Sequence, residues 1–128
     1  MIRSSIAVAA AVAVVLTGGT AAAAGPAGKK KTDLELSYQA DAGYAAALKL
    51  RCGPPGGPHP KPAAACRTLT RVHGQPDKIK AAPTICLLVY APITAEITGR
   101  WRGHKIAWKR TYGNKCEMNR ATGVLFTF

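Results

Sequence analysis

Residues 93–112, ITAEITGRWRGHKIAWKRTY, indicate the fold most directly. Apolar and polar residues alternate in 93–98 and again in 105–112. This period of two is typical of a strand with one buried face. The link between them, 99–103 (GRWRG), is short and bounded by glycine. We therefore predict two strands joined as an antiparallel hairpin.

Further strands are predicted on both sides of this hairpin. The same alternation occurs in 33–38 (DLELSY), 46–51 (AALKLR) and 123–128 (GVLFTF). Each segment places its larger apolar residues on one side of an extended chain. Together with the hairpin, these segments predict five half-buried strands.

A helix is predicted between the second and third strands. Its signals are Pro60 and Pro62 at the start, Ala65, Leu69 and Val72 at helical spacing, and Gly74 and Pro76 at the end. Segment 112–122 is long enough for a second, short helix. The predicted fold class is α+β, with a five-stranded antiparallel sheet, one longer helix packed on one face and one short helix.

Residues 1–24 have the layout of a secretory signal peptide. Arg3 precedes an uninterrupted apolar run at 6–16, and small residues follow at 21–24. A membrane anchor is the alternative, but this run of eleven residues is too short for a bilayer core of about 30 Å. We therefore expect a secreted, extracellular protein.

The predicted mature chain is a single small domain. Cleavage after Ala24, with Ala23 and Ala27 as alternative cut positions, leaves 104 residues. Segment 25–32 (GPAGKKKT), which contains Lys29–Lys31, is predicted to be a basic disordered tail. Residues 33–128 form the predicted domain.

The basic charge first suggests a polyanion as partner. The chain has 18 Lys+Arg against 6 Asp+Glu, a formal charge of +12, and loss of Arg3 leaves +11. Trp101 and Trp108 are interleaved with basic residues, so they could stack on bases. The alternative is a solvated basic face with Trp108 in the core. The sequence pattern leaves both interpretations open.

The motifs of an enzyme are absent from the predicted mature sequence. Its single serine, Ser37, lies in a predicted strand, and no Gly-x-Ser-x-Gly motif occurs. No local motif pairs carboxylates, and His59, His73 and His104 have no neighbouring acid in the sequence. We predict no catalytic residue, no metal site and no cofactor.

The four cysteines, Cys52, Cys66, Cys86 and Cys116, predict disulfides in an exported domain. The closely spaced ligand pairs of a zinc site do not occur among them. Four cysteines allow three pairings, of which the sequence-local one is the simplest. The residues alone do not choose among the three.

Segment 82–92, APTICLLVYAP, has two interpretations. Its continuous apolar run, 85–90, is typical of a buried strand. However, Pro83 and Pro92 flank the run and Cys86 lies within it. Such restraints also suit an exposed, extended and rigid segment, which can enter a protease cleft as a strand.

Separated motifs identify the chain from about Leu48 to Phe128 as similar to a known family. They are LKLRCGP at 48–54, GPHPKPAAAC at 57–66, HGQPD at 73–77, ICLLVYAP at 85–92, GRWRG at 99–103, NKCEMN at 114–119 and VLFTF at 124–128. In this order and with this cysteine spacing, the chain resembles the Streptomyces-type subtilisin inhibitor family of secreted serine protease inhibitors.

The resemblance implies a pairing, a reactive loop and a dimer. The disulfides would be Cys52–Cys66 and Cys86–Cys116, and the protein would form a homodimer through its sheet. The reactive loop would consist of Cys86, Leu87, Leu88, Val89 and Tyr90, with the scissile bond at Leu88–Val89 and with Asn114 and Pro92 as loop support. The chain departs from familiar members at Leu87, at Ala91 and in its high positive charge.

The predicted function is secreted inhibition of serine proteases by a substrate-like loop. The apolar Leu88 favours subtilisin-like and chymotrypsin-like targets over trypsin-like ones. The alternative is a secreted cationic module that binds a polyanion and carries a degenerate loop. Under the preferred interpretation, we expect neither nucleic acid nor a membrane as partner.

Overall fold

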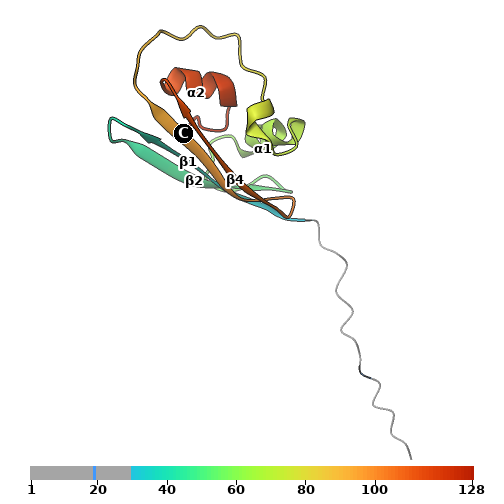
Figure 1. Cartoon of the computed structure of the whole chain (residues 1–128). Coiled ribbons are helices and arrows are strands. Elements are labelled where there is room, and N and C mark those ends of the chain that lie inside the picture. Colours follow the sequence, from blue (N-terminus) through green and yellow to red (C-terminus); the bar gives the residue numbers. More distant parts are fainter. Residues whose placement is uncertain (1–18, 20–29) are drawn as a thin grey trace, which may run out of the picture.

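The structure is a computed structural model that describes Gly19 and residues 30–128 (Figure 1). The predicted signal peptide, 1–24, lies outside the described residues except for Gly19. Of the predicted tail, 25–32, only the last three residues are described, and Thr32 is already the first residue of a strand.

An antiparallel sheet of four strands forms one layer of the described chain. The strands are β1 (Thr32–Ala40), β2 (Ala45–Cys52), β3 (Ile93–Trp101) and β4 (His104–Tyr112), in the spatial order β2-β1-β3-β4. All three neighbouring pairs are antiparallel. The four predicted strands at these places are thus confirmed.

The strand register explains the alternation seen in the sequence. Leu36 pairs with Leu48 on one side and with Ile97 on the other, and Ile97 pairs in turn with Trp108. Apolar residues therefore form rows across all four strands on one face. On that face Leu34, Leu36 and Ile97 are fully buried.

The β3–β4 hairpin has a tighter turn than the sequence predicted. β3 continues through Gly99 to Trp101, so the turn consists of Arg102 and Gly103 alone. Both have positive φ angles, 47° and 83°. Two such residues form the type I′ turn, whose twist matches that of paired strands.

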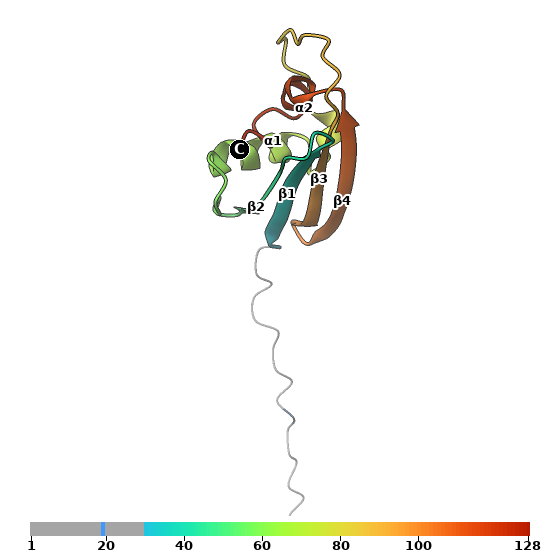
Figure 2. The ribbon, with the colours of Figure 1, turned by 90° about the vertical axis from the view of Figure 1, so that its left-hand side faces the viewer.

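Two helices cover the inner face of the sheet, as Figures 1 and 2 show. The longer helix, α1 (Pro62–Arg71), buries Ala65 and Leu69, and the shorter helix, α2 (Lys115–Thr122), buries Met118. A 3-10 turn, η1 (Pro76–Lys78), follows α1. The predicted α+β class and both predicted helices are confirmed.

The predicted fifth strand, 123–128, is wrong. Gly123 ends α2 with a φ of 62°, and the chain then turns, with Thr127 N donating to Val124 O at 3.3 Å. The adjacent Leu125 and Phe126 are both fully buried, which an alternating strand on one sheet face does not allow. This segment therefore fills the core between the helices and the sheet, and its apolar period of two does not reflect strand structure.

His59 helps to hold this terminal segment in place. Its buried ring lies with Nε2 3.0 Å from Leu125 O, while Nδ1 accepts from Lys61 N at 2.9 Å. The ring also meets Phe128 edge-on at 5.8 Å between centroids. The residues before α1 and the end of the chain are thus joined through one side chain.

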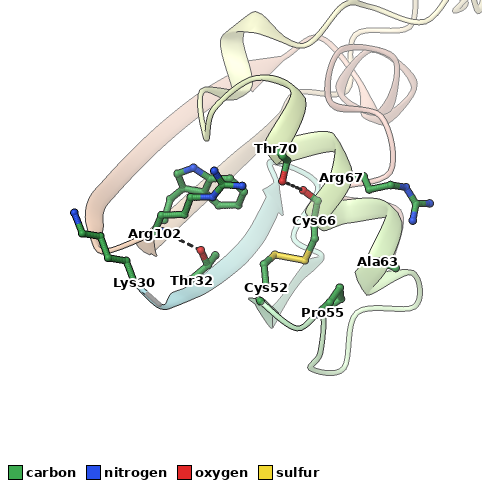
Figure 3. A pocket seen from close by; sticks show the side chains of 11 residues that line it. Lys30, Thr32, Cys52, Pro55, Ala63, Cys66, Arg67, Thr70 and Arg102 are labelled. Carbon is green, nitrogen blue, oxygen red and sulfur yellow. Dashed lines mark hydrogen bonds between the residues drawn. A yellow bond between two sulfur atoms is a disulfide. The ribbon is translucent and has the colours of Figure 1, made fainter. Parts of the chain in front are cut away.

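The disulfide Cys52–Cys66 joins the end of β2 to α1 (Figure 3). It borders a surface cavity of about 590 Å³ whose lining includes Lys30, Trp101 and Arg102. This cavity lies beside the β3–β4 turn, at the opposite end of the sheet from the long 79–92 connection (Figure 2). None of the predicted loop residues lines it.

Candidate functional site

The connection between η1 and β3 contains the segment with two interpretations, and it is an exposed loop. Residues 84–90 have no regular secondary structure. The exposed fractions are 92% for Ile85, 79% for Leu87, 101% for Leu88, 57% for Val89 and 88% for Tyr90. In Figure 2 this loop projects above α2. The buried-strand interpretation is therefore wrong, and the loop presents a run of apolar side chains to solvent, a feature that marks interaction sites.

A second disulfide anchors this loop. Cys86 pairs with Cys116, which lies in the first turn of α2, with 5.8 Å between their Cα atoms. Both expected disulfide pairings are therefore confirmed. The bond holds the loop two residues before Leu88 and ties it directly to a helix of the core.

Asn114 forms a second link between α2 and the loop. Its Nδ2 donates to the carbonyl oxygens of Leu87 at 3.2 Å and Val89 at 2.9 Å, one on each side of Leu88. Its Oδ1 accepts from Glu117 N at 2.9 Å and so caps the N-terminus of α2. Because the cap fixes the amide, its donors are directed at the loop.

Backbone hydrogen bonds hold both bases of the loop. Ala82 N donates to Arg120 O at 2.9 Å, and Ala91 N donates to Gly113 O at 2.8 Å. Pro92 O accepts from the amide of Asp41, in the β1–β2 turn, at 3.0 Å. Residues 83–90 therefore leave the body of the protein between two fixed points.

The backbone at Leu88 forms a tight three-residue turn. Val89 N donates to Leu87 O at 2.8 Å, which closes an i to i+2 hydrogen bond around Leu88. The Leu88 side chain is fully exposed. The Leu88–Val89 peptide bond thus lies next to an unpacked side chain, within a backbone fixed by Asn114 and the disulfide.

The sequence missed the partners that act through their backbone. The carbonyls of Gly113 and Arg120 and the amide of Asp41 have no side-chain signature that could reveal these contacts. Cys86 and Asn114, in contrast, were identified from the family motifs. Their side chains make the covalent bond and the two-sided hydrogen bonding.

The tryptophans that suggested stacking on bases are already engaged within the protein. Trp101 is buried, and the half-buried Trp108 ring stacks on Phe126 at 6.1 Å between centroids. Trp108 Nε1 donates to Asp77 Oδ1 at 3.0 Å, and Arg110 contacts the same oxygen. The hydrogen bond from Trp108 is the main reason that the pKa of Asp77 lies below its ordinary value, although burial opposes the shift. Arg110 lowers that pKa further.

The described residues, Gly19 and 30–128, form neither a cluster of metal ligands nor a membrane-spanning helix. In this part of the chain, three or more His, Cys, Asp or Glu residues are nowhere grouped so as to hold a metal ion. Within the same residues, every helix is too short or too polar to span a bilayer.

The comparisons with known proteins agree on one family. The family model described as subtilisin inhibitor-like matches residues 30–114. A subtilase-type protease inhibitor of Streptomyces coelicolor is 37% identical over 84 residues, which cover 64% of this chain and 58% of that protein. Subtilisin inhibitor-like protein 1 of Streptomyces cacaoi is 34% identical over 93 residues, covering 70% of this chain and 84% of that one.

Other similar proteins differ in their named targets and in the extent of the match. A trypsin inhibitor of Streptomyces longisporus is 39% identical over 84 residues, covering 64% of this chain and 58% of that protein. This chain thus matches little more than half the length of some curated relatives. Among solved structures, sermetstatin of Streptomyces caespitosus, in complex with Bacillus licheniformis subtilisin, has a similar fold with a TM-score of 0.59. It is 23% identical and matches 76% of this chain and all of that chain.

Proposed function

The chain belongs to the subtilisin inhibitor-like family, and we propose that it is a secreted serine protease inhibitor, not an enzyme, with 86–90 as its reactive loop. One observation carries the proposal. The apolar side chain of Leu88 is fully exposed, while Asn114 and the Cys86–Cys116 disulfide fix the backbone beside it. A hydrophobic residue held in solvent on a rigid backbone suits insertion into a partner's pocket.

Binding would use the loop as a ready-made substrate strand. An extended segment can pair its backbone groups with a protease cleft while its side chains enter the pockets. A flexible peptide loses conformational freedom on binding, at about 1–2 kcal/mol per residue for the backbone alone. The links from Cys116 and Asn114 impose much of that order during folding, so the bound state is favoured.

Slow turnover would follow from the same anchors. The protease serine attacks the Leu88 carbonyl carbon, and cleavage releases the amine of Val89. The disulfide holds the acyl side through Cys86, and Asn114 holds Val89 O on the amine side. The two ends stay close together, so the Val89 amine can attack the Leu88 acyl carbon, reform the peptide bond and release the protease serine, in competition with hydrolysis. The inhibitor contributes positioning and no catalytic group.

The target class is set by the chemistry of Leu88. A leucine side chain fits an apolar primary pocket, as in subtilisin-like and chymotrypsin-like proteases. It lacks the cation that pairs with the buried acid of trypsin-like enzymes. We therefore expect this chain to differ in target from its relative named as a trypsin inhibitor. Leu87 and Ala91, where the chain departs from familiar members, would adjust affinity without changing the mode of binding.

A homodimer formed through the sheet is the second part of the proposal. Both helices lie on one face, so the outer face of the sheet is free of them (Figures 1 and 2). On this face Glu35 lies opposite Lys49 in the strand register, and Glu96 lies opposite Lys109. Opposite charges therefore neighbour each other there despite the strongly basic chain. Sedimentation at rising protein concentration tests the dimer, and a monomer at every concentration would contradict it.

Titration of subtilisin with the purified mature protein tests the inhibitor proposal. We expect stoichiometric loss of activity at micromolar enzyme. Leu88→Lys should move the preference from subtilisin toward trypsin, whereas Leu88→Met should keep the original ranking. Absence of stoichiometric inhibition would refute the function. An unchanged ranking for the lysine variant would refute the assignment of the scissile position.

A further inference from the structure

Tyr44, in the β1–β2 turn, is an exposed aromatic residue outside the reactive loop. Among the described residues, six large hydrophobic side chains are exposed, and five of them belong to residues 85–90. Tyr44 is the sixth, with 48% of its surface accessible. An apolar side chain on a surface needs no explanation when it stands alone. Tyr44 does not stand alone, because it adjoins the loop.

Tyr44, the loop and the start of α2 line one shared groove of about 420 Å³, to which α2 and its cap contribute Asn114, Lys115 and Cys116. Every second residue of the loop lines this groove. These residues are Ile85, Leu87, Val89 and Ala91. Leu88 and Tyr90 are not part of the lining. The apolar surface thus continues sideways from the loop onto the β1–β2 turn, which lies beneath the loop in Figure 2.

A contact with the core residue Tyr38 orients Tyr44. Its ring meets that of Tyr38 edge-on, with 6.4 Å between centroids. Tyr38 OH donates to Phe128 O at 2.6 Å, and the Lys115 ammonium lies 4.9 Å from the centre of the Tyr38 ring. Tyr44 O also accepts from Ala40 N at 2.8 Å. A partner would therefore meet a phenol ring that is already ordered, and tyrosine loses little further freedom on binding.

The turn and the loop are also linked to each other. Asp41 N, three residues before Tyr44, donates to Pro92 O at the base of the loop at 3.0 Å. The loop is therefore held by this hydrogen bond to the β1–β2 turn as well as by its links to α2. The distance between the loop and the turn is constrained as a result. A protease that accepts Leu88 in its cleft would approach this groove in the same encounter.

We infer that Tyr44 is a second contact for the target protease, with the groove receiving an apolar side chain from the rim of the protease cleft. This inference rests on the proposed function and extends it to a residue outside the loop. Tyr44 contributes affinity directly, because tyrosine is enriched among the residues that supply binding energy at protein interfaces. Residues 86–90 remain responsible for the reaction with the catalytic serine.

Inhibition constants for subtilisin and the rate of Leu88–Val89 cleavage test this inference. Tyr44→Ala should weaken inhibition by about tenfold, as for a tyrosine that buries its ring at an interface. Tyr44→Phe should retain most of the affinity, because the ring supplies the apolar area. Lys105→Ala, at an exposed position in β4, is the remote control and should match the unchanged protein.

The cleavage rate separates direct contact from support of the loop. If Tyr44 only held the loop in shape, Tyr44→Ala would be cleaved faster by subtilisin, and the inference would be overturned. An inhibition constant equal to that of the unchanged protein would also overturn it, while the proposed function would stand. Failure of the unchanged protein to inhibit would refute both. Thermal unfolding of each variant checks that the fold is retained.

Discussion

The two disulfides serve different regions of the molecule. Cys52–Cys66 closes a sequence separation of 14 residues between β2 and α1, and its Cys66 side is buried in the core. Cys86–Cys116 closes a separation of 30 residues and joins an exposed loop to α2. The first bond connects two elements that already pack together. The second connects a segment that has few other contacts.

This difference indicates that the effect of a disulfide depends on how far other contacts already fix the chain around it. In a packed region its main effect is on the free energy of unfolding, because it restricts the unfolded chain. In an unpacked loop it also sets the native conformation itself. Loss of Cys52–Cys66 should therefore mainly lower the free energy of unfolding, whereas loss of Cys86–Cys116 should mainly weaken inhibition. The following variants test that separation.

The largest effect is expected from removing the loop disulfide. Cys86→Ala with Cys116→Ala should weaken inhibition of subtilisin by at least about a hundredfold, since ordering of the loop is then deferred to binding. The variant should be cleaved at Leu88–Val89 as a substrate. Inhibition constants and mass spectrometry of the products measure both results. A folded variant that still resists cleavage would contradict the role of this bond as a clamp.

The matched variant at the other disulfide should show the reverse pattern. Cys52→Ala with Cys66→Ala should lower the free energy of unfolding by about 3 kcal/mol, the chain-entropy estimate for a loop of this length. Inhibition by the folded fraction should stay within about threefold, because the contacts of the loop are intact. Denaturant unfolding and titration of active inhibitor measure the two quantities. Equal loss of inhibition in both double variants would refute the separation.

Asn114 allows the support of the loop to be separated from the capping of α2. Asn114→Asp keeps an acceptor for Glu117 N but removes the amide donors to Leu87 O and Val89 O. It should weaken inhibition by about tenfold, since one lost hydrogen bond is worth about 0.5–1.5 kcal/mol and the new carboxylate repels the carbonyls. Inhibition constants against subtilisin measure this loss.

Asn114→Ala is the control for that variant. It removes the cap as well, so it should also lower the free energy of unfolding by about 1 kcal/mol. Denaturant unfolding of the two variants compares them. If Asn114→Asp inhibits as well as the unchanged protein, the hydrogen bonds from Asn114 do not hold the loop.

The smallest effect is expected at Asp77, which belongs to neither disulfide region. Its carboxylate accepts from Trp108 and pairs with Arg110 at 3.0 Å, and its pKa lies below the ordinary 3.8. A lowered pKa stabilises the fold above pH 3.8, and this contribution is lost as the pH falls through the pKa of the folded state. Asp77→Asn should therefore cost less than about 1 kcal/mol at neutral pH, because both side chains of the ion pair are more than half exposed.

Unfolding of this variant and the unchanged protein at several pH values measures the dependence. The difference between the two should shrink as the pH falls below 3.8. Inhibition of subtilisin at neutral pH should be unchanged. A stability difference that grows on acidification would show that the ionised carboxylate does not stabilise the fold.

Strand alternation predicted most of the sheet because one face is buried against helices and the other is not. Leu34, Leu36 and Ile97 follow this rule in the sequence and in the structure. The same rule failed at 123–128, where the chain enters the core from the end of α2 and buries two adjacent residues. Period alone does not distinguish a strand from a short turn that is buried on several sides.

The loop shows a different limit of sequence reasoning. The apolar run 85–90 is typical of a core strand by composition, the flanking prolines and Cys86 also suit an exposed loop, and only the family motifs decided between the two. The deciding contacts are distant in sequence, such as Ala82 with Arg120 and Pro92 with Asp41. They join backbone groups, so residue types do not reveal them. Tyr44 was missed because its significance depends on the shared groove.

The full exposure of Leu88 has a consequence for the evolution of target range. A side chain that packs against nothing in its own protein adds little to folding stability, and surface substitutions usually change that stability by less than about 0.5 kcal/mol. Replacement of Leu88 should therefore be tolerated by the scaffold whatever its size or charge. Under the proposed function, a new target protease would require replacement of this one residue and no compensating mutations, so selection on recognition would act almost independently of selection on folding.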